Sequence, residues 1–315
     1  MLKNIVCIVS DPNINKILEP LKESSNLTIY NKKGLSPEEL IDLAKDANIL
    51  ITAPSSIKPL DRNIIESIPN LEHISLLTIG TDWIDLEYTK EQGIKVSNIG
   101  DATAESVAEH TWAMILDLSK RVSEFDRAAR LEGKYNFAEF KGKEVFGKTL
   151  GVLGLGNIGK RVAHIGEIFS MNILGVHTTM DPVDGITIVD KETLLKESDI
   201  IAVCLPLNSS TKDYISTQEI SLMKDCVIVV NPAREEIVNK DAVLDGIEIG
   251  KIYGYGIETP IMKQIPSDDP YYNYPNIIVT PHNAFNTIDA DKRTYEIIRD
   301  NVVSYLEGNP PNLVS

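Results

Sequence analysis

Short apolar runs separated by polar or amphipathic stretches fill the first hundred residues. Five runs have the length of buried strands: 4–9, 27–30, 47–53, 73–77 and 94–96. Between them, Ser36 and Glu39 form a capping box that predicts a helix start. Residues 61–68 predict a short helix that ends at Pro69. This alternation predicts a parallel sheet flanked by helices.

A long helical pattern over 104–118 follows. One face of it carries Val107, Thr111, Ile115 and Leu118. The pattern continues, with more charge, through 121–130, and a helix of this length can bridge two domains or pack on a second subunit. The polar stretch 133–148 is expected to be a connecting loop.

A second series of strand and helix patterns occupies the rest of the chain. Its six apolar runs are 149–153, 172–176, 200–204, 225–230, 254–257 and 276–280. Six strands are what a doubly wound dinucleotide-binding domain requires. A short helix is expected over 191–198, and a last helix at about 289–306 is expected to cross back onto the N-terminal domain.

The first run of this series leads directly into Gly154, Gly156 and Gly159, in GxGxxG spacing. These glycines permit a tight turn, the approach of a pyrophosphate to bare backbone, and close packing of the next helix. One face of that helix carries Ile158, Val162, Ile165 and Phe169. Unpaired N–H groups at its start favour anions, so the segment predicts a dinucleotide site rather than a purely structural turn.

The composition narrows the class of protein. The chain has 315 residues, enough for two domains, and its net charge of −15 argues against a nucleic-acid partner. It shows neither a signal peptide nor a membrane span nor metal-ligand spacing. Cys7, Cys204 and Cys226 stand in apolar runs, so we expect buried, reduced thiols and a cytoplasmic protein.

Two side chains follow strands of the second series, at the edge where doubly wound sheets bind ligands. Arg234, in Asn-Pro-Ala-Arg, can hold a carboxylate with two parallel hydrogen bonds, although a surface salt bridge with Glu235 or Glu236 is the alternative. His282, in Thr-Pro-His, can deliver a proton near neutral pH, although many histidines are only structural. Placement after strands of one domain favours a site for both.

Other candidates have weaker claims. The turn at Thr78, Ile79 and Gly80 could bind a substrate anion through its backbone N–H groups, or it could be an ordinary loop. The remaining histidines are His73, His110, His164 and His177.

Taken together, these segments resemble the D-isomer-specific 2-hydroxyacid dehydrogenase family from about Ala47 to Leu306. The segments that carry the resemblance stand in the family's order: 82–86 with Gly93 and Asn98, 105–110, the three glycines, 205–207 with Thr211, 231–234 and 280–284. The resemblance implies an α/β protein with two Rossmann-like parallel-sheet domains, one flavodoxin-like and one NAD-binding, and a cleft between them. It implies a substrate (catalytic) domain at 1–99 and 288–315, a dinucleotide-binding domain at 100–287, and a homodimer joined through the cofactor domains.

The implied reaction is reversible hydride transfer between NAD(P)H and C2 of a small 2-oxo acid. Arg234 would bind the carboxylate and polarise the ketone, and His282 would act as acid and base. Thr78, Ile79 and Gly80 would hold the other side of the carboxylate. The implied cofactor residues are Gly154, Gly156, Asn157, Ile158, Gly159, His177, Thr178, Leu205, Pro206, Thr211, Pro232, Ala233 and Glu258.

Three positions depart from the family pattern. His177 stands where an acidic residue usually binds the ribose hydroxyls, so both NAD and NADP are admissible. Lys263, the third candidate catalytic residue, stands where a glutamate usually pairs with the histidine, and Glu258 is close enough in sequence to substitute for it. An ammonium beside an imidazole lowers its pKa, so reduction is expected to be fastest at unusually low pH. Glu235, in place of a glycine, could compete for the charge of Arg234.

A second class of function fits the same fold, namely a catalytically weak or inactive dinucleotide-binding interaction or sensor protein. The lysine in place of the glutamate favours it. The presence of Arg234 and His282 together favours catalysis.

Overall fold

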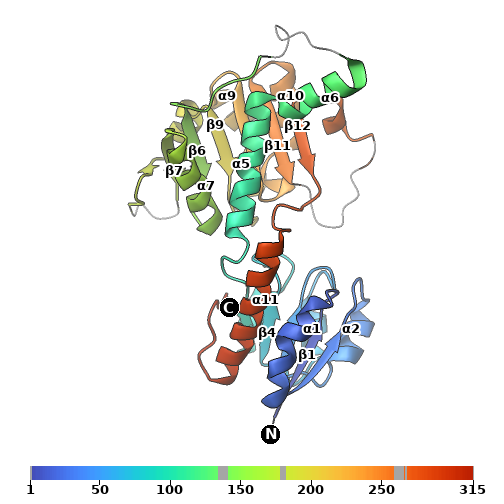
Figure 1. Ribbon diagram of the computed structural model, residues 1–315. Helices are drawn as coiled ribbons and strands as arrows, with labels where there is room; N and C mark the ends of the chain where they lie inside the picture. The colour runs from blue at the N-terminus through green and yellow to red at the C-terminus, as the bar shows by residue number, and fades with distance from the viewer. Residues whose placement is uncertain (1, 134–140, 178–181, 259–265, 267, 315) are drawn as a thin grey trace. The chain divides into compact units, whose positions relative to one another are not determined.

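The computed structural model describes residues 2–133, 141–177, 182–258, 266 and 268–314. The chain forms two compact units (Figure 1). The first comprises Met1–Thr103 with Ile288–Ser315, and the second comprises Ala104–Thr287. Within the described residues, every helix is too short or too polar to cross a membrane.

The first unit is built on a five-stranded parallel sheet. Its strands are β1 (Lys3–Ile8), β2 (Ser25–Tyr30), β3 (Ile49–Thr52), β4 (His73–Leu76) and β5 (Lys95–Ser97). They stand in the order β2-β1-β3-β4-β5, which is the flavodoxin-like order. The five predicted strands are therefore confirmed, with ends that differ by up to two residues.

Helices cover both faces of this sheet. They are α1 (Asn13–Leu18), η1 (Glu19–Glu23), α2 (Pro37–Ala44), α3 (Arg62–Glu66), α4 (Leu86–Glu91) and α11 (Ile288–Leu306). The capping box predicted at Ser36 starts α2. Side chains alternate along a strand, so Val6 and Ile8 pack with α2, α3 and α4, whereas Ile5 and Cys7 pack with α1 and α11. The last helix thereby contributes to the core of the first unit.

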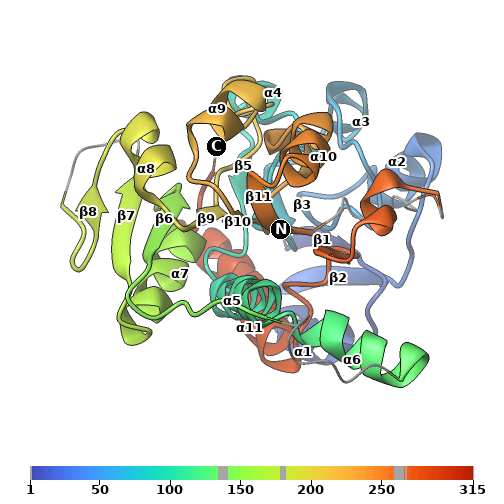
Figure 2. The ribbon, with the colours of Figure 1, turned by 90° about the horizontal axis from the view of Figure 1, so that it is seen from above.

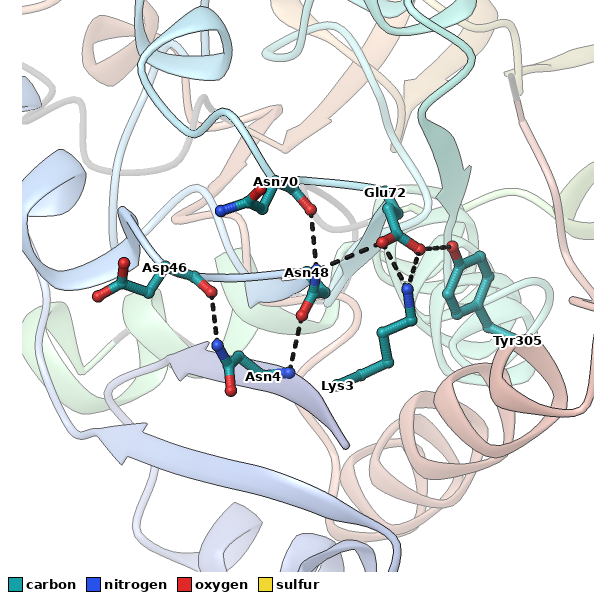
Figure 3. Close-up of polar contacts among 7 residues, drawn as sticks. All are labelled: Lys3, Asn4, Asp46, Asn48, Asn70, Glu72 and Tyr305. Atoms are coloured by element: carbon teal, nitrogen blue, oxygen red, sulfur yellow. Dashed lines mark hydrogen bonds and ion pairs between the residues drawn. The ribbon is translucent and has the colours of Figure 1, made fainter. Parts of the chain in front are cut away.

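A polar cluster closes the amino ends of these strands (Figure 3). Glu72 accepts hydrogen bonds from Lys3 at 2.5 and 2.7 Å, from Asn48 at 3.3 Å and from Tyr305 at 3.1 Å. The ring of Tyr305 also stacks on the buried ring of His73, with 4.4 Å between the centroids. Since Tyr305 belongs to α11, the cluster fixes the end of that helix to the sheet.

The second unit is built on a seven-stranded parallel sheet. Its strands are β6 (Thr149–Leu153), β7 (Asn172–Val176), β8 (Thr187–Ile188), β9 (Ile200–Val203), β10 (Val227–Asn231), β11 (Ile252–Glu258) and β12 (Ile277–Thr280). The order is β12-β11-β10-β9-β6-β7-β8. The six predicted strands are confirmed, and the two-residue β8 is additional. The chain changes direction across the sheet between β6 and β9, and ligands of doubly wound sheets bind at such a point.

The helices of the second unit again form two layers. They are α5 (Ala104–Lys120), α6 (Val122–Glu132), α7 (Asn157–Ile168), α8 (Lys191–Glu197), α9 (Thr217–Leu222), η2 (Glu235–Ile237), α10 (Lys240–Glu248) and η3 (Pro270–Asn273). Helices α5 and α7 lie side by side on one face, and α8, α9 and α10 cover the other (Figure 2). Trp112 of α5 joins the first pair by donating to the carbonyl of Val162 at 2.9 Å.

Two sequence expectations about this unit are wrong. The helical pattern over 104–130 is two helices, because Arg121 adopts a left-handed conformation with φ of 57° and ends α5 before α6 starts. Cys226 is exposed rather than buried, because the strand starts at Val227 and Cys226 lies in the preceding turn with φ of 61°.

Candidate functional site

The predicted glycine turn joins β6 to α7. Gly154 has φ of +96°, and a methyl group on it would lie 2.6 Å from the carbonyl oxygen of Cys204. A methyl group on Gly159 would lie 1.9 Å from the carbonyl oxygen of Gly154. A methyl group on Gly156, in contrast, would meet no atom of the described residues within 4 Å. The first and third glycines therefore permit the turn itself, and the second faces open space.

The start of α7 fits a phosphate. Gly156 is its N-cap, and it has no side chain that could bind the first N–H groups of the helix. Asn157 and Ile158 form the first turn, without an acidic residue that would repel an anion. Open space at Gly156 and uncapped donors beside it are what a pyrophosphate needs. The residues present thus fit a nicotinamide dinucleotide.

The neighbouring strand β9 continues into Leu205 and Pro206. Thr211 holds this segment, since its Oγ1 donates to the carbonyl of Pro206 at 2.6 Å and accepts from the backbone N–H of Asn208 at 2.8 Å. The hydroxyl of Thr211 therefore shapes the loop that borders the glycine turn.

Arg234 follows β10 in a turn built by Asn231. The buried Asn231 side chain accepts from the N–H of Ala233 at 3.1 Å and donates to the carbonyl of Arg234 at 2.7 Å. Pro232 and Ala233 lie between them. Arg234 donates from Nη1 to the carbonyl of Ala233 at 2.9 Å. The asparagine thus fixes the backbone from which the guanidinium extends at the carboxyl edge of the sheet.

Glu258 ends the next strand, β11, and its side chain is 2% exposed. It accepts hydrogen bonds from Thr280 Oγ1 and from the N–H of Ala284, at 3.1 Å for the latter, and it pairs with His110 Nε2 at 3.1 Å. Burial raises the pKa of Glu258, but these hydrogen bonds outweigh burial and hold that pKa below its ordinary value. The carboxylate therefore holds protein groups of β12 and α5.

His282 lies in the turn after β12, with φ of 53°. Its ring lies beside that of Phe285, tilted by 59°, with 5.9 Å between the centroids. Strands β10, β11 and β12 are adjacent in the sheet, so the turns that carry Arg234 and His282 leave the same edge on either side of Glu258.

The remaining predicted residues fall in several places. His177 directly follows β7, next to β6. Thr78, Ile79 and Gly80 form a turn of the first unit, in which Asn98, Trp83 and Thr78 side chains donate to the carbonyls of Ile79 and Gly80 at 2.8–3.0 Å. Thr178 and Lys263 lie outside the described residues.

His110 is the residue that the sequence reasoning undervalued. It lies on α5, 148 positions before Glu258 in numbering, and no local motif links the two (258 − 110 = 148). Its neighbour one turn earlier, Ser106, donates to the carbonyl of Ala284 at 2.6 Å. The spacing of 106 and 110 places both on one face of a helix, which is the only sequence signal that they share a neighbour.

Comparison with known proteins finds related sequences over most of the chain. Residues 112–284 match the family model of the D-isomer specific 2-hydroxyacid dehydrogenase NAD binding domain. A hydroxypyruvate reductase of Thermotoga maritima is 33% identical over 90% of this chain and 93% of its own. A D-3-phosphoglycerate dehydrogenase of Methanocaldococcus jannaschii is 31% identical over 97% of this chain, which spans only 60% of the length of that relative.

Solved structures show the same architecture over nearly the whole chain. An acyclic imino acid reductase in complex with NADPH and D-Arg superimposes with a TM-score of 0.91 at 26% identity, covering 99% of this chain and 100% of the other. The family match carries the assignment, and the two parallel sheets and the glycine turn agree with it. The chain therefore belongs to the D-isomer-specific 2-hydroxyacid dehydrogenase family and is an oxidoreductase that uses NAD or NADP.

Proposed function

We propose that this enzyme reduces the C2 carbonyl of a small 2-oxo acid to a D-2-hydroxy acid, and oxidises the product in reverse. The observation that supports this most directly is the edge formed by β10, β11 and β12, from which an arginine turn and a histidine turn extend on either side of Glu258. A guanidinium and an imidazole are the two groups that such a reduction needs from the protein.

The proposed roles follow from the chemistry of each side chain. When bound, the reduced nicotinamide ring supplies a hydride. Arg234 binds the substrate carboxylate and polarises the C2 carbonyl, which makes C2 a better acceptor. His282 gives a proton to the carbonyl oxygen as C2 accepts the hydride, so a 2-hydroxy acid forms. We also assign the backbone N–H groups around Thr78, Ile79 and Gly80 to the substrate carboxylate.

A test follows the absorbance of NADH and NADPH with a panel of 2-oxo acids. Arg234→Ala is expected to lower kcat/KM at least a hundredfold, because a charged hydrogen-bonded pair to the substrate is lost. Arg299→Ala, whose arginine is paired with Asp300 on the exposed side of α11, is the control and should stay within twofold of the wild type. Binding of dinucleotide without reduction of any acid would support the interaction or sensor alternative.

A second candidate function is reduction of the C=N bond of an imino acid. The superposition with the imino acid reductase over nearly the whole chain favours it. Arg234 would bind the same carboxylate, and the hydride would reach the imine carbon. Adding an amine to each 2-oxo acid of the panel distinguishes the two, since faster oxidation of the dinucleotide only in the presence of amine would identify the imine as substrate.

The proposal includes a homodimer joined through the second units, as the family resemblance implies, and a location in the cytoplasm, as expected from the cysteines. The second unit carries exposed apolar side chains that a dimer interface would cover if it included them: Val122, Leu131, Phe146, Ile168 and Ile249. Light scattering after gel filtration tests it, and a mass of one chain, 34.9 kDa, would contradict the dimer.

A further inference from the structure

One buried carboxylate holds both ends of the turn that carries His282. Glu258 accepts from the side chain of Thr280, two residues before the histidine, and from the N–H of Ala284, two residues after it. His282 itself has φ of 53°, a left-handed conformation that non-glycine residues seldom adopt. Such a conformation persists only where surrounding contacts fix it, and the carboxylate supplies two of them.

Helix α5 fixes the same turn from the other side. Ser106 Oγ donates to the carbonyl of Ala284 at 2.6 Å, so this residue is bound at both its N–H and its carbonyl. His110 Nε2 lies 3.1 Å from Glu258 Oε1 and 3.3 Å from Thr280 Oγ1. The turn is therefore tied to a rigid helix as well as to the sheet.

The contact between His110 and Glu258 has a defined direction. An ionised carboxylate only accepts hydrogen bonds, so Nε2 of His110 must carry the proton that lies between them. Glu258 is 2% exposed, and a carboxylate so far from water needs every donor that it has. Loss of the His110 donor would favour a protonated Glu258, which would then donate at one oxygen where it now accepts.

We propose that His110 and Glu258 are positioning residues that hold the His282 imidazole in the geometry for proton transfer, a role that rests on the proposed function of His282. His110 keeps Glu258 ionised and oriented, and Glu258 fixes the two ends of the turn. His110 acts through Glu258 and needs to touch neither substrate nor dinucleotide. Loss of the His110 donor therefore affects the chemical step and leaves dinucleotide binding at the glycine turn unchanged.

The kinetic arm of the test compares three variants. His110→Leu removes the donor, and kcat for reduction is expected to fall at least tenfold, with the dinucleotide Kd within twofold. His110→Gln retains an N–H near the Nε2 position, and kcat is expected to recover to within threefold of the wild type. His164→Gln is the matched control, because His164 also pairs with a glutamate, Glu167, at 3.0 Å, but is 73% exposed in its side chain.

A spectroscopic arm separates this proposal from the proposed function. Histidines are labelled with ¹³C at Cε1, and the His282 signal is assigned by its loss in His282→Asn. His110→Leu and Glu258→Gln are expected to shift that signal, and His164→Gln is not. Absence of any acid reduction by the wild type would remove the proposed function but leave this readout intact.

Two results would overturn the positioning role. One is an unmoved His282 signal in both His110→Leu and Glu258→Gln. The other is an unchanged kcat in His110→Leu that is folded by circular dichroism. If His110→Leu does not fold, the isosteric Thr280→Val removes one end of the same carboxylate contact, and the same two readouts decide.

Discussion

A methyl group on Gly159 would lie 1.9 Å from the carbonyl oxygen of Gly154. The oxygen belongs to the backbone of the turn between β6 and α7, and the methyl carbon would be bonded directly to that backbone, so neither can rotate away. Gly159→Ala is therefore expected to destabilise the protein by about 3 kcal/mol or to prevent folding, as overpacking against rigid atoms does. Thermal unfolding followed by circular dichroism measures this loss of stability. A melting temperature equal to that of the wild type would contradict the prediction.

Gly156→Ala should behave in the opposite way. A methyl group there meets no described atom within 4 Å, and the backbone has φ of −73°, which alanine readily adopts. The variant is expected to unfold at the wild-type temperature but to bind dinucleotide at least tenfold more weakly, since the methyl group occupies space that we assign to the pyrophosphate. Titration of tryptophan fluorescence with NADH gives the Kd. An unchanged Kd would argue against a pyrophosphate site beside Gly156.

His177 is expected to influence the choice between NAD and NADP. A carboxylate after β7 would bind the ribose hydroxyls of NAD and repel a 2′-phosphate. His177→Asp should therefore raise the Kd for NADPH at least tenfold relative to that for NADH. His164→Asp places the same charge on the exposed side of α7 and controls for net charge. An equal effect of both substitutions on the ratio of the two Kd values would speak against a role of His177.

His73 predicts a loss of stability on acidification. Its ring is 0% exposed, and burial lowers its pKa from 6.5 to about 4. A depressed pKa means that the folded state favours the neutral ring, so the contribution of His73 is complete above pH 6.5 and is lost as the pH falls from about 6.5 to about 4. The loss is about 3 kcal/mol, at 1.36 kcal/mol per pKa unit.

Denaturant unfolding at several pH values measures this loss. His73→Phe retains an aromatic ring to stack on Tyr305 but cannot take a proton. The variant is therefore expected to show a smaller decrease in the free energy of unfolding between pH 6.5 and 4. If the free energy of unfolding fell by the same amount in wild type and variant over this pH range, groups other than His73 would cause the decrease.

Periodicity and turn chemistry in the sequence determined most of the fold. Apolar runs of three to seven residues marked the strands of both sheets, because strands buried on both faces have no polar alternation to obscure them. The capping box at Ser36 and the glycines before α7 marked helix starts through their local chemistry. The two-residue β8 and the break at Arg121 left no such mark, since a two-residue strand has no period and an arginine, unlike a glycine, does not indicate a left-handed residue.

The sequence by itself determined which side chains follow the strands at the ligand edge, because chain order and strand ends are local properties. Only the tertiary structure decided that Glu258 accepts from Thr280 and Ala284 and pairs with His110. That contact depends on how α5 crosses β11 and β12, and helix packing of this kind is set by the shapes of many apolar side chains together. The residues that hold His282 thus come from packing, whereas His282 itself was visible in the sequence.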